Sequence, residues 1–300
     1  MVNFKQIELQ DKAWMDELFA ASDYQGTEYG FTAMWMWSRI YNSEVARVGD
    51  FVVIRSLEDG WADYISPAGR GSDEDFKRMM LALMDDADRM KLGFSLVPIP
   101  KVKQEYVEKM FPGQFKFEDI RNAYDYIYLR EDLVNLTGKR YQPKRNHLHH
   151  FEELPDWSYE QITSENIGEC IEMNKEWCKR NGCNEDISLN AETCAVQRAL
   201  YNFEALKLKG GLLRVGGKVV AYTCGEKMNS DTFIVHIEKA FDDVDGAYPM
   251  INREFLKHEA MDCKYVNRED DSGDPGLRTA KLSYHPAFLL EKCLGKIKFF

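Results

Sequence analysis

Residues 232–269 read TFIVHIEKAFDDVDGAYPMINREFLKHEAMDCKYVNRE and carry the clearest structural signal in the chain. Alternating apolar residues over 232–238 predict a strand, and a second strand is predicted over 265–269. Between them, Ala247, Met250 and Phe255 share one face of a predicted helix. A strand followed by a helix and another strand is a crossover connection, so we expect these two strands to pair in parallel.

An antiparallel hairpin is predicted just before this crossover. The apolar runs 212–215 and 219–224 are separated by Gly216-Gly217, a dipeptide typical of tight turns between antiparallel strands. Two helices are predicted before the hairpin, from about 163 to 178 and from about 191 to 207. The second half of the chain therefore predicts one mixed sheet flanked by helices.

The first half of the chain repeats this order of elements. Ser72 and Asp75 form the helix-capping pattern Ser-x-x-Asp. The helix that follows has one apolar face, made of Phe76, Met79, Met80, Leu83, Ala87 and Met90. A strand is predicted over 94–97, and we expect Pro98 to end it.

Length and element order together predict two tandem domains. Three hundred residues are about twice the length of an average domain. We predict an α/β fold of the α+β kind, with a first domain over 1–135, a basic connector over 136–160 and a second domain over 161–300. Each domain is expected to hold a mixed, mostly antiparallel sheet flanked by helices.

Composition and charge exclude several classes of protein. The chain has 39 Lys and Arg against 50 Asp and Glu, a formal net charge of -11, which argues against binding to DNA. The first nineteen residues contain four acids and no long apolar run, unlike a secretory signal. The uncharged apolar stretch 29–38 is far shorter than the ~20 residues that span a bilayer. We expect no integral membrane segment and a cytoplasmic location.

The cysteine pattern and the absence of three common motifs exclude further classes of protein. Seven cysteines lie in the second half of the chain without a CxxC pair, so we expect reduced cytosolic thiols and no metal site. The chain contains no GxGxxG, GxxxxGK[ST] or GxSxG motif, which removes the main support for a dehydrogenase, a P-loop enzyme or an α/β-hydrolase.

The strand over 232–238 carries a possible general base. Its alternation places His236 and Glu238 on the same face, just before a loop and a helix start. An imidazole or carboxylate in this position could accept a proton from a substrate. The same two side chains could instead form a buried polar pair that neighbours satisfy. Both interpretations remain open.

A dense group of charged residues follows the last predicted crossover strand. Polar and charged side chains gather here: Asn267, Arg268, Glu269, Asp270, Arg278, Lys281, Tyr284 and His285. Such density at the carboxyl end of a strand is typical of a ligand site in an open sheet, where the cations could hold a carboxylate or phosphate. The alternative is a solvated loop with surface ion pairs.

The basic connector allows two interpretations. Lys139, Arg140, Lys144 and Arg145 could hold the phosphates of an RNA or nucleotide-bearing donor, or they could pair with acids elsewhere. His147, His149 and His150 follow, but their spacing fits no common metal motif. The loop acids Asp242, Asp243 and Asp245 are interpreted as helix-capping charges that would repel a pyrophosphate.

Two motifs carry a resemblance to a known family. The segments 136–146, LTGKRYQPKRN, and 267–286, NREDDSGDPGLRTAKLSYHP, are similar to bacterial proteins related to the C-terminal domain of phosphatidylglycerol lysyltransferase. The resemblance implies two tandem GNAT-type acyltransferase folds. Some relatives with this arrangement transfer aminoacyl groups from aminoacyl-tRNA to lipids or to peptidoglycan bridges. The positions that match the family are Lys144, Arg145, Asn146, Asn267, Arg268, Glu269, Asp270, Arg278, Lys281, Tyr284 and Pro286.

The resemblance and the charged segments together predict an acyltransferase. Aminoacyl-tRNA is the expected donor and an amine or hydroxyl of a lipid or cell-wall compound the expected acceptor, with no required cofactor. The expected catalytic residues are His236, Glu238 and Lys281. The expected substrate-binding residues are Asn267, Arg268, Glu269, Asp270, Arg278 and Tyr284, and the expected donor-phosphate residues are Lys144, Arg145 and Asn146. The alternatives are an acyl-CoA-dependent N-acyltransferase acting on a small amine and a non-catalytic binding protein on a transferase fold.

Overall fold

The computed structural model describes residues 2–183 and 185–297, which divide into two compact units. The first unit holds the described residues through Tyr126, then Glu269–Thr279 and the described residues from Phe288 onward, and the second holds Ile127–Arg268 and Ala280–Ala287. Two of the boundaries fall within regular elements, β8 (Asp125–Leu129) and α11 (Pro275–Leu282). The last boundary falls directly before β14 (Phe288–Leu290). Parts of the predicted second domain therefore cluster with the first unit.

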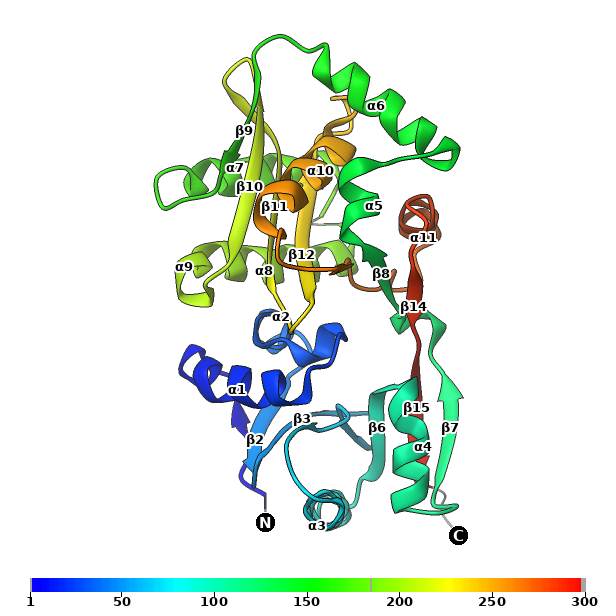
Figure 1. Ribbon diagram of the computed structural model, residues 1–300. Coiled ribbons are helices and arrows are strands. Elements are labelled where there is room, and N and C mark those ends of the chain that lie inside the picture. The colour runs from blue at the N-terminus through cyan, green and yellow to red at the C-terminus, as the bar shows by residue number, and fades with distance from the viewer. Residues whose placement is uncertain (1, 184, 298–300) are drawn as a thin grey trace. The chain divides into compact units, whose positions relative to one another are not determined.

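A mixed sheet forms the centre of the first unit (Figure 1). Its strands run in the order β1-β2-β3-β4-β6-β15-β7, and β5 pairs with β3. They are β1 (Lys5–Gln6), β2 (Glu44–Val48), β3 (Phe51–Glu58), β4 (Trp61–Tyr64), β5 (Ala68–Gly69), β6 (Gly93–Pro100), β7 (Phe115–Asp119) and β15 (Lys292–Ile297). Strands β4 and β6 pair in parallel, and the other described pairs are antiparallel.

The helices of the first unit confirm the predicted cap and apolar face. They are α1 (Lys12–Ser22), α2 (Phe31–Trp37), α3 (Asp73–Arg89) and α4 (Lys101–Met110), with short 3-10 turns at Leu9–Asp11, Thr27–Tyr29 and Arg121–Ala123. Before α3, the backbone N–H of Asp75 donates to the Ser72 hydroxyl, and that of Ser72 donates to the Asp75 carboxylate. The predicted apolar face is buried at Phe76, Met79, Met80, Leu83 and Ala87.

Strand β6 does not end at Pro98 as the sequence predicts. It continues to Pro100, and Ile99 and Pro100 pair with Cys293 and Lys292 of β15. The register of β15 shifts between Cys293 and Gly295, beside the prolines. Because a bulge removes regular ladder bonds, it accommodates residues that lack an N–H.

The second unit holds a mixed sheet whose strands run in the order β8-β13-β12-β11-β10-β9. Beyond β8, these are β9 (Trp157–Gln161), β10 (Lys209–Val215), β11 (Lys218–Lys227), β12 (Thr232–Ala240) and β13 (Tyr265–Asn267). The predicted hairpin is confirmed: β10 and β11 are antiparallel around Gly216 and Gly217, whose φ angles of 55° and 78° suit a tight hairpin turn. The predicted crossover is also confirmed, since β12 and β13 pair in parallel.

Helices flank this second sheet. They are α5 (Arg130–Asn135), α6 (Gln142–Glu152), α7 (Ile167–Arg180), α8 (Ile187–Tyr201), α9 (Phe203–Leu206) and α10 (Ala247–Glu259), with a 3-10 turn at Lys139–Tyr141. Helix α10 packs on one face of the sheet and α7 on the other (Figure 1). Within the predicted basic connector, α6 begins at Gln142 and includes Pro143, because proline is compatible with the first turn of a helix.

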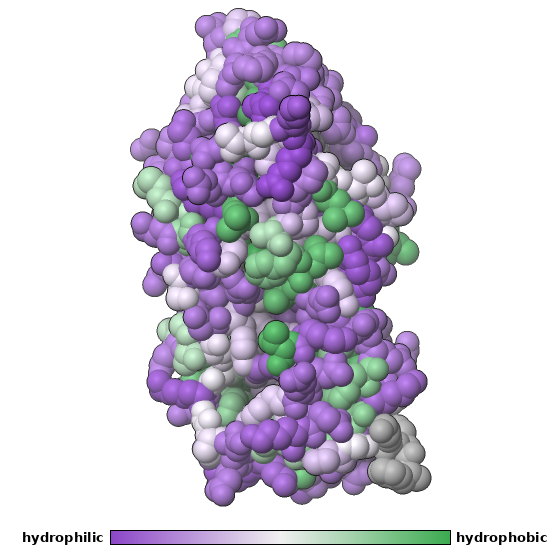
Figure 2. All heavy atoms as spheres, turned by 45° about the vertical axis from the view of Figure 1, so that its right-hand side comes forward, coloured by the Kyte–Doolittle hydropathy of each residue, from purple (hydrophilic) through white to green (hydrophobic). Residues whose placement is uncertain are grey.

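The surface agrees with the acidic, charge-rich composition. The face in Figure 2 is mainly hydrophilic, and its apolar side chains form small separate groups. Within the described ranges 2–183 and 185–297, every helix is too short or too polar to cross a bilayer. All seven cysteines are free, and five of them are buried.

A buried ion triad joins the last strand of the first unit to two distant segments. The ammonium of Lys292, 2% exposed, lies 2.7 Å from a Glu28 oxygen and 2.8 Å from an Asp125 oxygen. Burial would lower the pKa of Lys292, but the charges of Asp125 and Glu28 outweigh it and hold that pKa above its ordinary value. The triad therefore anchors β15 in the first sheet.

Replacing the triad's cation should destabilise the protein strongly. Lys292→Met leaves two buried carboxylates without their cation, so we expect a loss of about 3–5 kcal/mol in the free energy of unfolding. Urea denaturation measures this change. Lys116→Met is the matched control, because Lys116 forms an exposed pair with Glu118 on β7 and its loss should change the stability far less. Equal losses in the two variants would contradict the anchoring role.

Candidate functional site

The candidate site of the second unit lies where two parallel strands stop pairing. The pairing of β12 with β13 covers Thr232 to Ile234 and ends where Ile234 meets Asn267. Strand β12 continues to Ala240, whereas β13 ends at Asn267. The carboxyl end of parallel strands is the edge at which open sheets bind ligands. Glu238 and Arg268 lie at this edge, one on β12 and the other directly after β13.

Glu238 and Arg268 form a shielded ion pair. Nη2 of Arg268 lies 2.6 Å from Oε1 of Glu238, and each side chain is 12% exposed. From α10, Nδ2 of Asn252 donates to Oε2 of Glu238 at 2.8 Å. Both carboxylate oxygens are therefore held by donors, which fixes the orientation of Glu238. Asn252 was missed in the sequence, although it lies on the predicted helix between Met250 and Phe255.

Two cations lie against the ring of Tyr284. The guanidinium carbon of Arg268 is 4.8 Å from the ring centre, and Nζ of Lys144 is 4.0 Å from it. The pKa of Lys144 is lowered to about 8: burial is the largest cause, the charge of Arg268 adds to it, and the charge of Glu238 opposes both. Burial also raises the pKa of the Tyr284 hydroxyl above its ordinary value. The structure thus brings four of the predicted residues together: Lys144, Glu238, Arg268 and Tyr284.

One nitrogen of the Arg268 guanidinium is available for a further hydrogen bond. Its Nη1 is buried and has no hydrogen-bond partner within residues 2–183 and 185–297. A buried donor without a partner costs free energy, and functional sites are where such groups are retained. The cluster therefore has the positive charge and the free donor that a carboxylate, phosphate or oxyanion would use.

Lys281 holds the backbone at the edge of the cluster. Nζ of the buried Lys281 donates to the backbone carbonyl of Arg268 at 2.6 Å. The backbone carbonyl of Lys281 accepts a hydrogen bond from the Tyr128 hydroxyl at 2.8 Å. Asn267 is fully buried in β13. These contacts position Arg268.

His236 lies deeper in the protein than the sequence suggested. Its Nε2 is 3.2 Å from a carboxylate oxygen of Glu226 on β11, and its side chain is 1% exposed. Such burial leaves no surface by which an acceptor could reach the imidazole. His236 and Glu238 are both satisfied by neighbours, but each has its own partner: Glu226 for His236 and Arg268 for Glu238.

Two residues of the basic segment shape the turn before α6. Arg145 donates to the carbonyl of Gly138 at 2.8 Å and also to the carbonyl of Leu136. Asn146 accepts a hydrogen bond from Gln142 at 2.8 Å. These contacts are local, so Lys144 is the residue of this motif that reaches the cluster.

Three further predicted residues belong to the first unit. Arg278 forms two hydrogen bonds, at 2.8 and 2.9 Å, with the buried carboxylate of Asp271. Burial would raise the pKa of Asp271, but hydrogen bonds from Arg278 and Tyr126 hold it well below its usual range. Asp270 accepts hydrogen bonds from Ser272, and the carbonyl of Glu269 accepts one from the N–H of Tyr126.

The chain resembles known proteins over almost its whole length. Residues 19–294 match the family described as "Phosphatidylglycerol lysyltransferase, C-terminal". A crystal structure of a conserved protein of unknown function from Bacteroides thetaiotaomicron is 39% identical, with a TM-score of 0.94 over 99% of this chain and 100% of that chain.

Two further solved structures share the fold at low identity. L-PGS from Bacillus licheniformis is 13% identical, with a TM-score of 0.63 over 89% of this chain and 88% of that chain. FemX is 11% identical, with a TM-score of 0.62 over 99% of this chain and 97% of that chain. The two mixed sheets flanked by helices thus confirm the predicted tandem GNAT-like fold.

The titration of Lys144 should report the charges around it. We expect a pKa of about 8 by carbon NMR of reductively methylated protein, with the signal assigned through Lys144→Arg. Glu238→Gln should lower this pKa further, because the carboxylate favours the charged amine, and Arg268→Gln should raise it. Glu118→Gln, an exposed position in the first unit, is the control and should leave it unchanged. An ordinary lysine pKa of about 10.4 would contradict the arrangement.

Proposed function

Because the chain belongs to the family of the phosphatidylglycerol lysyltransferase C-terminal domain, we propose that it is an aminoacyltransferase. The family match over residues 19–294 is the observation that carries this proposal. The donor is aminoacyl-tRNA, and the acceptor is an amine or hydroxyl of a lipid or cell-wall compound. L-PGS and FemX share the fold of this chain, which agrees with the tandem arrangement that the proposal requires.

The Lys144, Glu238 and Arg268 cluster supplies the groups that such a transfer needs. Glu238 takes a proton from the attacking amine or hydroxyl. The nucleophile bonds to the carbonyl carbon of the aminoacyl ester, and the ester C–O bond then breaks. The proton passes from Glu238 to the departing ribose oxygen, so the carboxylate is regenerated and no further reactant is consumed.

The cations of the cluster stabilise negative charge. Attack on the ester places a negative charge on its carbonyl oxygen, and preorganised donors near that oxygen lower the barrier. Arg268 has the free Nη1 donor, and Lys144 lies against the same tyrosine ring. With a pKa of about 8, Lys144 is mostly charged at neutral pH and loses its charge as the pH rises above that value. The cation role therefore operates at and below neutral pH.

Lys281 acts as a positioning residue in this proposal. Its ammonium holds the backbone carbonyl of Arg268, so it acts through Arg268 and does not touch the reacting atoms. Arg278 is left outside the proposal because its two hydrogen bonds to Asp271 already use its charge. The free cysteines support a reducing compartment, which is why we place the protein in the cytoplasm.

A donor comparison tests the proposed activity. Purified protein is incubated with radiolabelled lysyl-tRNA or alanyl-tRNA and either phosphatidylglycerol vesicles or a peptidoglycan precursor, and products are separated by chromatography. We expect the label to move to one acceptor class. A parallel reaction supplies labelled acetyl-CoA with small amines. Transfer from acetyl-CoA alone would establish the N-acyltransferase alternative, and no transfer from either donor would favour a binding protein.

Substitutions in the cluster test the assigned roles. Glu238→Gln and Lys144→Met should each lower the transfer rate by about 100-fold or more, because one removes the base and the other a stabilising charge. Lys175→Met is the matched control, since Lys175 is an exposed lysine of α7 in the same unit, pairs with Glu172 and should keep the full rate when replaced.

The positioning role of Lys281 predicts a different pattern. Lys281→Ala should lower the rate, and Lys281→Arg should restore part of it, because arginine can also donate to the Arg268 carbonyl. Circular dichroism and urea midpoints show whether each variant folds. Full activity of folded Glu238→Gln would remove Glu238 from the mechanism.

A further inference from the structure

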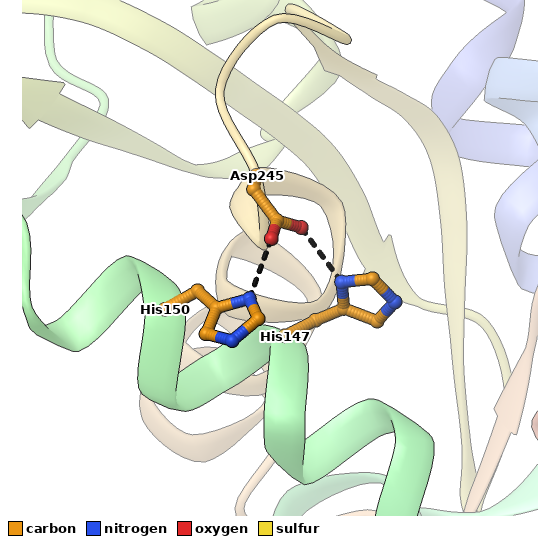
Figure 3. Close-up of side chains that lie close together, drawn as sticks. All are labelled: His147, His150 and Asp245. Atoms are coloured by element: carbon orange, nitrogen blue, oxygen red, sulfur yellow. Dashed lines mark hydrogen bonds and ion pairs between the residues drawn. The ribbon is translucent and has the colours of Figure 1, made fainter.

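Two histidines of α6 and an aspartate from the loop after β12 converge on the surface of the second unit (Figure 3). Nδ1 of His147 is 2.6 Å from Oδ1 of Asp245, and Nδ1 of His150 is 2.6 Å from Oδ2. Residues three apart on a helix share a face, so both imidazoles turn toward the same carboxylate. Neither the proposed transfer nor the family resemblance uses these three residues.

The backbone that carries the three side chains is held firmly. The adjacent face of α6 is anchored by Leu148 and Phe151, which are buried. Gly246, next to Asp245, has a φ of 80°, and a Cβ there would lie 2.0 Å from the carbonyl oxygen of His147. Because only glycine permits so close an approach, the loop rests directly against α6. Asp245 is therefore fixed over the two histidines.

The side chains offer a ligand set for a transition metal. Their ligand atoms, two imidazole nitrogens and one carboxylate oxygen, all lie within 4.8 Å of one another. Zinc binds imidazole nitrogen and carboxylate oxygen at about 2.0–2.2 Å, so a small inward rotation of these exposed side chains would enclose an ion. Calcium and magnesium prefer all-oxygen ligands, which makes them a poorer match.

We propose that His147, His150 and Asp245 bind a divalent transition-metal ion, for which zinc is the best match. Each imidazole would present the lone pair of Nδ1 and keep its proton on Nε2, and Asp245 would supply a carboxylate oxygen. The ion replaces the two hydrogen bonds that Asp245 now accepts. Three protein ligands leave at least one coordination position for water or another ligand.

Metal binding at this place would tie two elements of the candidate site together. Helix α6 carries Lys144, three residues before His147, and the loop with Asp245 follows β12, which carries Glu238. An ion shared by the helix and the loop would restrict their relative movement. Binding also stabilises the folded state by mass action, so the melting temperature should rise with metal concentration.

Cobalt and zinc titrations of the full chain test the site. After removal of metals with a chelator, Co²⁺ is added and its visible absorption followed, and Zn²⁺ is then used to displace it. We expect one equivalent to bind the wild type. His147→Ala, His150→Ala and Asp245→Asn should each weaken binding by at least about 10-fold. These side chains are exposed, so the variants should fold.

His149→Ala is the matched control for this experiment. His149 is an exposed histidine of the same helix whose Nδ1 lies 3.4 Å from Glu152, outside the group of three. The control should bind cobalt as the wild type does. An equal loss in His149→Ala, or unchanged binding in the three ligand variants, would overturn the proposal. Binding with a thiolate-to-cobalt absorption band would overturn it too, because the ligands would then be cysteines such as the exposed Cys194.

Discussion

The ion pair between Arg268 and Glu238 is the interaction around which the candidate site is built. Strands β12 and β13 are hydrogen-bonded over a short stretch, and their diverging ends expose polar edges that need partners. The ion pair lies at this opening, and Asn252 holds the second oxygen of Glu238. Lys144 and Tyr284 then pack around Arg268. Removing either charge would leave the other shielded from water and uncompensated.

Buried charge in the two units has different partners. In the first unit, Lys292 is matched by Glu28 and Asp125, and Asp271 receives hydrogen bonds from Arg278. Such groups have the arrangement of structural ion pairs. In the second unit, Nη1 of Arg268 has no hydrogen-bond partner among the described residues, and the neighbouring Lys144 has its pKa lowered to about 8. Charge that is held in place but not fully compensated is typical of a ligand-binding site.

The regular elements and part of the site could be predicted from local patterns. The hairpin at Gly216-Gly217 and the crossover after Glu238 follow from turn chemistry and hydrophobic period, which act over a few residues. Arg268 was recognised because charge at the end of a crossover strand indicates a ligand site. Asn252 carried no such signal. A single polar residue on a helix indicates a site only when its partner is known, and here the partner is Glu238.

Local sequence was sufficient for the class of fold and for the charged ends of its crossover strands. It was not sufficient to predict which distant residues these side chains contact. That β15 returns to the first sheet, and that Lys144 meets Tyr284, depends on segments more than a hundred residues apart in the chain. No periodicity within a segment encodes such a meeting, because it results from how apolar faces and buried charges are satisfied across the whole unit.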